Sequence, residues 1–286
     1  MDLSGVGVWS SQLRYGNPAK SAEAAAELEE LGFSALWIPD VGGPLFDTVD
    51  HLLSSTKRVV IATGILNLWL HEPSDVATKY ASLTATHGER FLLGIGVSHA
   101  PLIDSKEPGR YRKPLAATSA FLDALDAAEN PVPAENRVLA ALGPKMLELA
   151  ATRSRGAHPY LVTPDHTRKA RQILGDGPLL LPEQSVILTA DPADAREIGI
   201  DWLRAYLALP NYANNLLRSG FTPDDLASVS DRLFDAIIAW GDEETVLRRV
   251  DEHRGVGADH VCIQVLTADP REFPMEQWRR LAAAMR

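Results

Sequence analysis

The stretch Glu89-Arg-Phe-Leu-Leu-Gly-Ile-Gly-Val-Ser-His-Ala-Pro-Leu102 contains the pattern that decides the fold. Phe91 to Leu93 form an apolar run that is too short for a helix and typical of a strand buried on both faces. Gly94 and Gly96 remove side chains near the end of this strand, so another group can approach the backbone there. His99 then supplies a polar group. The pattern fits a core strand that runs into a loop, and it also fits a strand whose end holds a ligand.

The two glycines do not form a dinucleotide-binding fingerprint. That motif needs a third glycine, but His99 occupies the position. It also needs a helix opening directly after the glycines and an acidic residue about 20 residues further on, and neither is expected here. A Rossmann-type cofactor site at this strand is therefore excluded.

Composition restricts the class of protein. The chain has 286 residues, of which 45% are hydrophobic and 23% charged, as in ordinary globular proteins. Its formal net charge of −10 argues against a general binder of nucleic acid or of membrane surfaces. The single cysteine, Cys262, excludes a disulfide framework and a thiolate metal site. The first residues lack the features of a signal peptide, and no apolar run approaches 18 residues, so we expect a soluble cytoplasmic protein.

Strands and helices are predicted to alternate along the whole chain. Besides the strand in the opening stretch, seven short apolar runs are expected to be strands: 6–9, 35–38, 58–65, 138–142, 157–162, 185–189 and 260–266. Proline marks the start of most intervening helices, as it does at the first helical position. Residues 210–240 contain additional helical pieces that are too apolar to be solvated. This pattern predicts an α/β fold, a (β/α)8 TIM barrel with a helical insertion after strand 7, in a single domain over 1–286. A doubly wound open sheet is the structural alternative.

The carboxyl ends of the strands are the expected place for chemistry in such a barrel. The strand ends contain many small or apolar residues and few acids, which suits a flat, largely apolar ligand. A phosphosugar enzyme would need acids or a lysine base at these ends. His158, Asp165 and His166 could be drawn as a metal triad. Because Asp165 follows Pro164 at a helix start, it is better explained as stabilising that helix, and we predict no metal site.

Basic residues outnumber acids between residues 143 and 171. Two predicted helix N-termini, at Gly143-Pro144 and Thr163-Pro164, lie in this region and offer free N–H groups to an anion. The arginines could equally lie on the outer faces of helices. Lys145 stands in the first turn after a strand, where a phosphate contact and a solvated lysine are equally good explanations.

Several segments resemble a known superfamily. Residues 30–40 (Glu-Leu-Gly-Phe-Ser-Ala-Leu-Trp-Ile-Pro-Asp), 58–65 and 90–99 are similar to the luciferase-like (bacterial luciferase) TIM-barrel oxidoreductases. Three longer motifs resemble the subgroup that depends on the deazaflavin coenzyme F-420. They are Gly-Val-Ser-His-Ala-Pro-Leu at 96–102, the pair 140–150 and 156–167, and Gly-Ala-Asp-His-Val-Cys-Ile-Gln-Val at 257–265. The similarity covers essentially the whole chain.

The resemblance implies coenzyme F-420, which carries hydride at ring C5, as the cofactor. In relatives the ring lies against a bulged third strand with a non-proline cis peptide, which here would be Gly64–Ile65. The phosphate-bearing tail in relatives crosses the ends of strands five and six. The cofactor-binding residues implied in this chain are Asp40, Gly64, Ile65, Gly96, Val97, Ser98, Gly143, Pro144, Lys145, Met146, His158 and Tyr160.

One departure from the family concerns the proton donor. Several relatives place a histidine directly after the strand-two aspartate, whereas Val41 follows Asp40 here. His99 is the substitute that we predict as catalytic, because imidazole titrates near neutral pH, although it could merely hydrogen-bond its own loop. Asp40 either contacts the ring as a second catalytic residue or satisfies loop N–H groups. Trp9 either walls the substrate pocket or packs in the core.

The expected function is hydride transfer between coenzyme F-420 and an unidentified small organic substrate. A flavin mononucleotide (FMN)-dependent monooxygenase of the same superfamily is the alternative, and a non-catalytic deazaflavin-binding protein is a third. The resemblance implies a homodimer. We expect no nucleic-acid or membrane partner.

Overall fold

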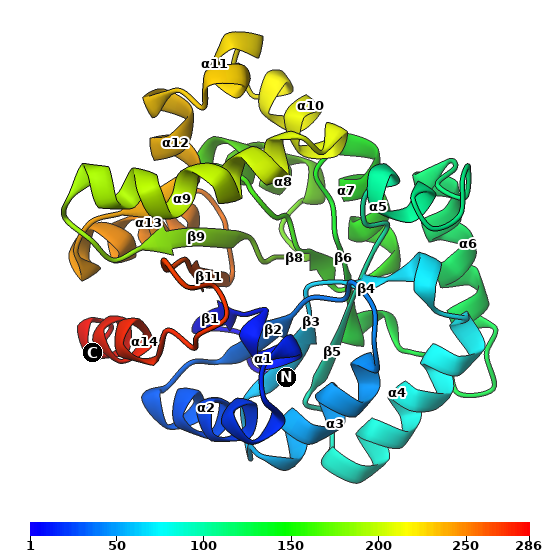
Figure 1. Ribbon diagram of the computed structural model, residues 1–286. Coiled ribbons are helices and arrows are strands. Elements are labelled where there is room, and N and C mark those ends of the chain that lie inside the picture. Colours follow the sequence, from blue (N-terminus) through cyan, green and yellow to red (C-terminus); the bar gives the residue numbers. More distant parts are fainter.

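The computed structural model describes residues 1–286, and it shows parallel strands in one curled sheet with helices over its outer face (Figure 1). The strands are β1 (Val6–Trp9), β2 (Ala35–Ile38), β3 (Val60–Thr63), β4 (Leu66–Asn67), β5 (Phe91–Gly96), β6 (Arg137–Leu139), β7 (Gly156–Ala157), β8 (Leu179–Leu180), β9 (Glu183–Ile187), β10 (Ile238–Trp240) and β11 (Val261–Val265). The longer helices are α2 (Pro18–Leu31), α3 (Leu45–Ser54), α4 (Pro73–His87), α6 (Pro114–Asp126), α7 (Pro144–Arg153), α8 (Pro164–Leu174), α9 (Pro192–Leu207), α10 (Pro210–Arg218), α13 (Glu243–Gly255) and α14 (Met275–Ala284). The shorter ones are α1 (Gln12–Tyr15), α5 (Ala100–Asp104), α11 (Pro223–Ser228), α12 (Asp231–Ile237) and the 3-10 turns Leu68–Leu70 and Ala134–Asn136.

The strand order follows the chain around the sheet. It runs β10-β9-β11-β1-β2-β3-β5-β6-β7-β8, with β4 paired to β5, and every pairing is parallel. Only Leu181 and Pro182 separate β8, which pairs with β7, from β9, which pairs with β11. One segment of chain thus joins β8, at one end of this order, to β9, the second strand from the other end. This order lacks the reversal of a doubly wound sheet, and the α/β fold with a curled parallel sheet is confirmed.

The predicted bounds of the third strand, 58–65, are wrong at both ends. β3 stops at Thr63, and β4 begins at Leu66. Between them the Gly64–Ile65 peptide bond is cis, as the resemblance implies. The side chain of Thr63 explains the interruption. Its Oγ1 donates to Gly94 O and accepts from Gly94 N–H, both at 2.8 Å, so the hydroxyl replaces the main-chain ladder with β5. The backbone between β3 and β4 therefore bulges at this point.

The later strands are also displaced from their predicted bounds. The sixth, expected over 157–162, is reduced to β7 because Pro159 has no N–H and Leu161 adopts a left-handed φ of 57°. The seventh begins earlier than the predicted 185–189, since β8 and β9 together span 179–187. The fifth and eighth are shortened to β6 and β11, and β10 was not predicted.

Most helices begin as predicted. Proline occupies the first turn of α2, α4, α6, α7, α8, α9, α10 and α11, where its missing N–H needs no partner. The short helices α1 and α5 were not predicted. No helix combines the length and the apolar character that crossing a membrane requires.

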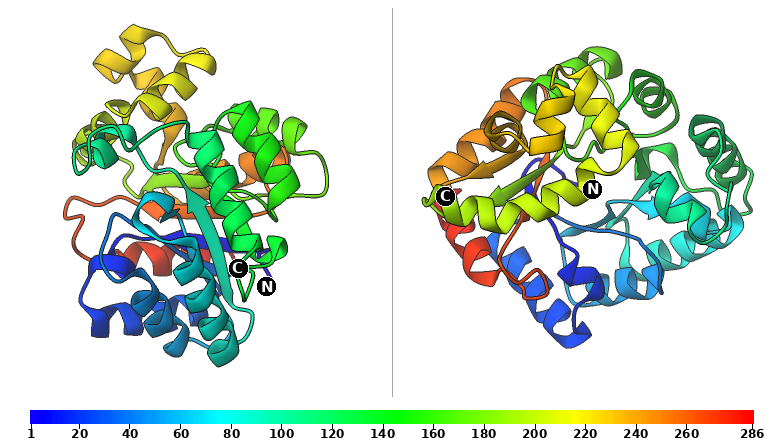
Figure 2. Two further views of the ribbon diagram at one scale, coloured as in Figure 1. Left: turned by 90° about the vertical axis from the view of Figure 1, so that its right-hand side faces the viewer. Right: turned by 45° about the horizontal axis from the view of Figure 1, so that its top comes forward.

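The helices between α9 and β10 stand beyond one end of the sheet (Figure 2). As predicted, their apolar residues are buried: Leu216, Phe221, Leu233, Phe234 and Ile237 pack in a cluster separate from the main core. Leu217 is an exception, since it remains exposed. The cluster lies on the side of the sheet where the strands end, so it positions α10 over the candidate site.

Candidate active site

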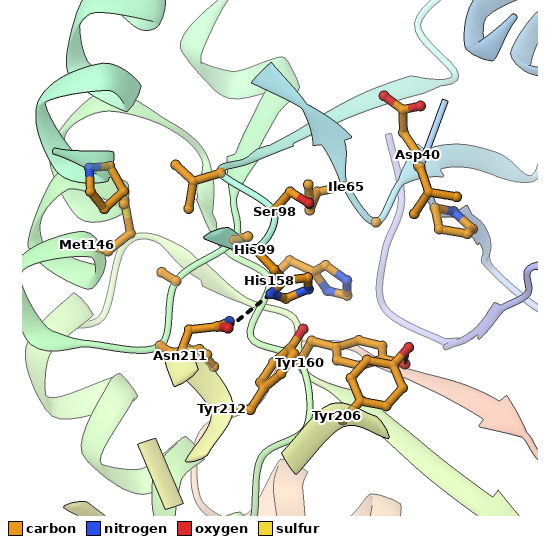
Figure 3. Close-up of a pocket in the computed structure, with 18 of the residues that line it drawn as sticks. Asp40, Ile65, Ser98, His99, Met146, His158, Tyr160, Tyr206, Asn211 and Tyr212 are labelled. Carbon is orange, nitrogen blue, oxygen red and sulfur yellow. Dashed lines mark hydrogen bonds between the residues drawn. The ribbon is translucent and has the colours of Figure 1, made fainter. Parts of the chain in front are cut away.

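A cavity of about 630 Å³ lies at the carboxyl ends of the strands. Residues that follow β2, β3, β5, β6 and β7 line it together with Trp9 at the end of β1, and α9 and α10 close one side (Figure 3). Eleven of the predicted site residues line this cavity. They are Trp9, Asp40, Gly64, Ile65, Val97, Ser98, His99, Gly143, Met146, His158 and Tyr160.

Three predicted cofactor contacts lie elsewhere. Pro144 and Lys145, in the first turn of α7, are exposed and do not line the cavity. Gly96 is buried, and a Cβ placed on it would lie 2.7 Å from Ile65 Cγ1 and 2.9 Å from Ala140 Cβ. The absence of a side chain at Gly96 is therefore required by packing between strands, and the structure does not place this residue against a ligand.

The part of the cavity wall nearest the sheet is formed by Trp9, Gly64 and His158. The Trp9 indole Nε1–H donates to Gly64 O at 3.0 Å. A Cβ added to Gly64 would lie 2.7 Å from Trp9 Nε1 and 3.1 Å from His158 Nε2. Only glycine fits between these two rings, so the bulge after β3 presents bare backbone to the cavity.

His99 is held by the helices that close the cavity. Its Nδ1 lies 2.9 Å from Asn211 Oδ1 of α10, and its ring is 5.1 Å from the ring of Tyr212. Since the amide oxygen can only accept, His99 Nδ1 carries the hydrogen and Nε2 is the basic atom. Burial lowers the pKa of His99 below its ordinary value, so the neutral imidazole predominates at pH 7.

Asp40 ties the loops around the cavity together. Its buried carboxylate accepts hydrogen bonds from Gly42 N–H at 3.1 Å and Asn67 N–H at 3.2 Å, and Oδ2 lies 2.7 Å from His71 Nε2. These contacts join the segments after β2 and β4. The arrangement favours the explanation in which Asp40 satisfies loop N–H groups, and a direct role in catalysis stays a prediction. His71 is an aspartate partner that its position in the sequence did not indicate.

Tyrosines form the side of the cavity opposite the bulge. The Tyr160 hydroxyl donates to Gln264 Oε1 at 2.6 Å and lies 2.9 Å from the hydroxyl of Tyr206. Burial raises the pKa of Tyr160 well above its ordinary value and that of Tyr206 to about 12, so both remain protonated at neutral pH. The Trp9 ring lies 5.4 Å from that of Tyr160, so aromatic surface continues from the tyrosines to the wall at Gly64.

The basic residues between 143 and 171 mostly serve the outer helix faces. Arg153 forms ion pairs with two aspartates of α6, Arg168 pairs with Asp165, and Arg171 binds Asp259 and backbone carbonyls. These arginines do not face the cavity. The sequence left this alternative open, and the structure selects it.

The basic side chain that lines the cavity comes from outside the 143–171 segment. Arg218, at the end of α10, lines it, and Nη2 lies 3.9 Å from where a Cβ on Gly143 would be. Gly143 is the N-cap of α7, and no side chain caps the N–H groups of that helix. Arg218 forms no ion pair with a carboxylate, and its side chain donates one hydrogen bond, to Asn215 Oδ1 at 3.3 Å. A cation and free N–H groups thus converge at one end of the cavity.

Sequence reasoning missed the residues contributed by the helices after β9. Tyr206, Asn211, Tyr212, Asn214 and Arg218 all line the cavity. For the four residues of α10 the only signal was the apolar pattern of 210–240, which predicts that the segment is buried but not what it covers, and Tyr206 of α9 had no such signal.

Fold and site together define a parallel α/β protein with a mainly apolar cavity at the carboxyl ends of its strands and a cation, Arg218, at one end of that cavity. The profile of the luciferase-like monooxygenase family matches residues 3–260. A Mycobacterium tuberculosis protein provisionally named as a coenzyme F-420-dependent oxidoreductase is 30% identical over 119 residues. That match covers 41% of this chain and 33% of the relative, so the chain spans about a third of the relative's length.

Solved structures share the fold. An F-420-dependent secondary alcohol dehydrogenase, solved with an F-420–acetone adduct, has a TM-score of 0.75 at 16% identity, with both chains covered completely. The oxygenating component of the 3,6-diketocamphane monooxygenase of Pseudomonas putida, solved with FMN, has a TM-score of 0.70 at 14% identity. That match covers 98% of this chain and 96% of the monooxygenase. The chain therefore belongs to the luciferase-like monooxygenase family, whose members are flavin- or deazaflavin-dependent oxidoreductases.

Proposed function

We propose that this protein is a coenzyme F-420-dependent oxidoreductase that transfers hydride between the deazaflavin and a small, mainly apolar organic substrate. One observation carries the proposal: a single cavity joins the glycine bulge after β3 to the pair of Arg218 and the uncapped N-terminus of α7. The name of the Mycobacterium tuberculosis relative supports the choice of coenzyme F-420.

The residues present fit such a cofactor. A Cβ on Gly64 would collide with Trp9 and His158, so the backbone there stays bare, and a ring could lie against it beside the side chain of Ile65. Gly143, Met146 and Arg218 would hold the phosphate-bearing tail. When bound, the coenzyme supplies the hydride donor or acceptor at ring C5.

The chain itself supplies orientation and a base. His99 is neutral at pH 7 with Nε2 unprotonated, so it is suited to accept a proton from a substrate that is being oxidised. In the reverse direction it would donate only from the small protonated fraction. Trp9 and Tyr160 wall the substrate space with aromatic surface, and their contacts with Gly64 O and Gln264 hold these side chains in place.

We also propose that the fold is a (β/α)8 barrel in one domain over 1–286, with the helical insertion after the seventh strand lying within 210–240. The junction of β8 and β9 supports this count, since one segment pairs with β7 and with β11. The homodimer implied by the resemblance would be tested by light scattering against the chain mass of 31.1 kDa.

Fluorescence titration of the purified protein tests the cofactor. We expect coenzyme F-420 to bind at least tenfold more tightly than FMN. The F-420 complex should then exchange hydride with members of a panel of small alcohols and ketones, followed by loss or gain of the deazaflavin absorbance. Binding of F-420 without turnover on any substrate would favour the non-catalytic binding protein. Failure to bind F-420 would refute the proposal.

An FMN-dependent monooxygenase is the second candidate, because the structural neighbours include the FMN complex of the camphane enzyme. Preference for FMN in the titration, together with substrate-dependent oxygen consumption by the reduced complex, would establish this function instead.

A further inference from the structure

His158 carries a hydrogen-bonding atom that the structure leaves unused. It follows β7, the residue is 1% exposed, and it lines the cavity between Ile65 and Tyr160 (Figure 3). Nδ1 lies 2.7 Å from Leu181 O, whereas the buried Nε2 has no hydrogen-bond partner. A buried polar atom without a partner is costly, so such an atom beside a cavity indicates a ligand contact.

The contact of Nδ1 determines the chemistry of Nε2. A backbone carbonyl only accepts hydrogen bonds, so the proton of neutral His158 must sit on Nδ1. Burial lowers the pKa of His158 to about 4, and the ring is therefore neutral at physiological pH. Nε2 is then a lone pair that can accept a hydrogen bond and cannot donate one. The ring cannot flip to reverse these roles without losing the bond to Leu181, and it is stacked on Trp37 with centroids 4.3 Å apart.

The surroundings of Nε2 restrict what can reach it. The Cβ position of Gly64 lies 3.1 Å from Nε2, and the Trp9 indole borders the same space. Because these two residues border the atom, only a small donor group, such as a hydroxyl or a ring N–H, fits beside Nε2. His260 has the same arrangement, except that its Nε2 has a partner. Its Nδ1 lies 3.1 Å from Leu3 O, and its Nε2 accepts a hydrogen bond from Trp37 Nε1 at 3.1 Å.

We propose that His158 Nε2 accepts a hydrogen bond from an O–H or N–H at the innermost end of the ligand in this cavity. His158 is thereby a specificity-determining residue that selects ligands with a hydrogen-bond donor at that end. The donor would be either a ring N–H of the bound coenzyme or a hydroxyl of the substrate. This inference deepens the proposed function, but the state of Nε2 does not depend on which coenzyme binds.

Long-range nitrogen–proton NMR of protein labelled with ¹⁵N-histidine tests the proposal. In the free protein we expect His158 and His260 to show protonated Nδ1 and unprotonated Nε2 between pH 6 and 8. The variant His158→Asn, whose amide can still donate to Leu181 O, assigns the resonance. A protonated His158 Nε2 in the free protein would overturn the inference.

Ligand addition identifies the donor. An upfield shift of His158 Nε2 when coenzyme F-420 is added would assign the donor to the coenzyme ring. A shift that appears only when cyclohexanol is added to that complex would assign it to a substrate hydroxyl. The His260 Nε2 resonance should stay in place in both cases, because its partner is Trp37. If both ligands bind and His158 Nε2 does not move, the inference is wrong.

A third probe separates this inference from the proposed function. Phenol and anisole have the same ring, but only phenol has an O–H. Without any coenzyme we expect the wild-type protein to bind phenol about tenfold better than anisole, and His158→Asn to lose this preference. If coenzyme F-420 fails to bind while phenol is still preferred, the proposed function fails and the inference stands. Equal binding of phenol and anisole by the wild-type protein would overturn the inference whatever the coenzyme.

Discussion

Arg218 is predicted to hold the anionic end of the coenzyme, in place of Lys145, which the resemblance to the family implies. Arg218 lines the cavity beside Gly143, whereas Lys145 is exposed outside it. The variant Arg218→Ala should therefore weaken the binding of coenzyme F-420, and Lys145→Ala should leave it within twofold of the wild type.

The size of the effect follows from Coulomb's law. Two unit charges about 5 Å apart interact by roughly 0.8 kcal/mol in water and about 3 kcal/mol at the effective dielectric constant of a protein surface. Arg218 is exposed, which favours the lower end of this range. A loss of about 1 kcal/mol corresponds to a fivefold increase in Kd. Because the contact is partly solvated, the difference between Arg218→Ala and the wild type should shrink as salt is raised.

Fluorescence titration at low and high ionic strength measures both predictions. Lys145→Ala is the matched control, because it removes a cation from the same helix terminus without touching the cavity. Arg218→Lys should recover part of the affinity, since it keeps the charge and loses the planar fork. A Kd that rises for Lys145→Ala and not for Arg218→Ala would refute the assignment and place the anion outside the cavity.

Three further predictions concern the site and its stability. His99→Ala should lower kcat at least tenfold with the Kd for coenzyme F-420 unchanged, and a smaller loss would remove His99 from acid–base catalysis. Gly64→Ala should raise the Kd for coenzyme F-420 and lower the free energy of unfolding by about 1–3 kcal/mol, because the added Cβ would displace Trp9. Urea unfolding identical to that of the wild type would contradict this. Burial lowers the pKa of His260 to about 4, as it does for His158. Between pH 6.5 and 4 the unfolded chain therefore binds more protons than the folded protein. The free energy of unfolding should fall by roughly 3 kcal/mol per histidine as the pH is lowered through this range. Urea unfolding of the wild type and His260→Gln at pH 7.5 and 4.5 checks this, and equal losses in the two proteins would contradict it.

The buried carboxyl of Glu183 acts in the opposite direction in that experiment. Burial raises its pKa to about 7, so its protonation stabilises the folded state as pH falls from about 7 to 4.5. The comparison of wild type with His260→Gln isolates the histidine contribution, because Glu183 is common to both proteins.

Much of the fold could be read from local patterns. Phe91 to Leu93, followed by glycines, indicated a buried strand because strand burial leaves an uninterrupted apolar run. Prolines at helix starts located most helices, since the missing N–H is harmless only in the first turn. Strand ends were less accurate: the Thr63 hydroxyl interrupts main-chain pairing through its contacts with Gly94 of the neighbouring strand, which no local pattern records.

Some features of the candidate site could likewise be predicted from the sequence, and others could not. The sequence by itself determined that polar and glycine residues follow the strands, and because parallel strands end at one edge, Trp9, Gly64, His99 and His158 could be expected together. Only the tertiary structure decided that Arg218 and not Lys145 faces the cavity. A helix reaches this edge from the distant segment 210–218 through packing of its apolar face, and the direction of that face depends on the whole cluster beneath it. Side-chain contacts across more than 100 residues are set by folding, and the spacing of residues in the chain does not encode them.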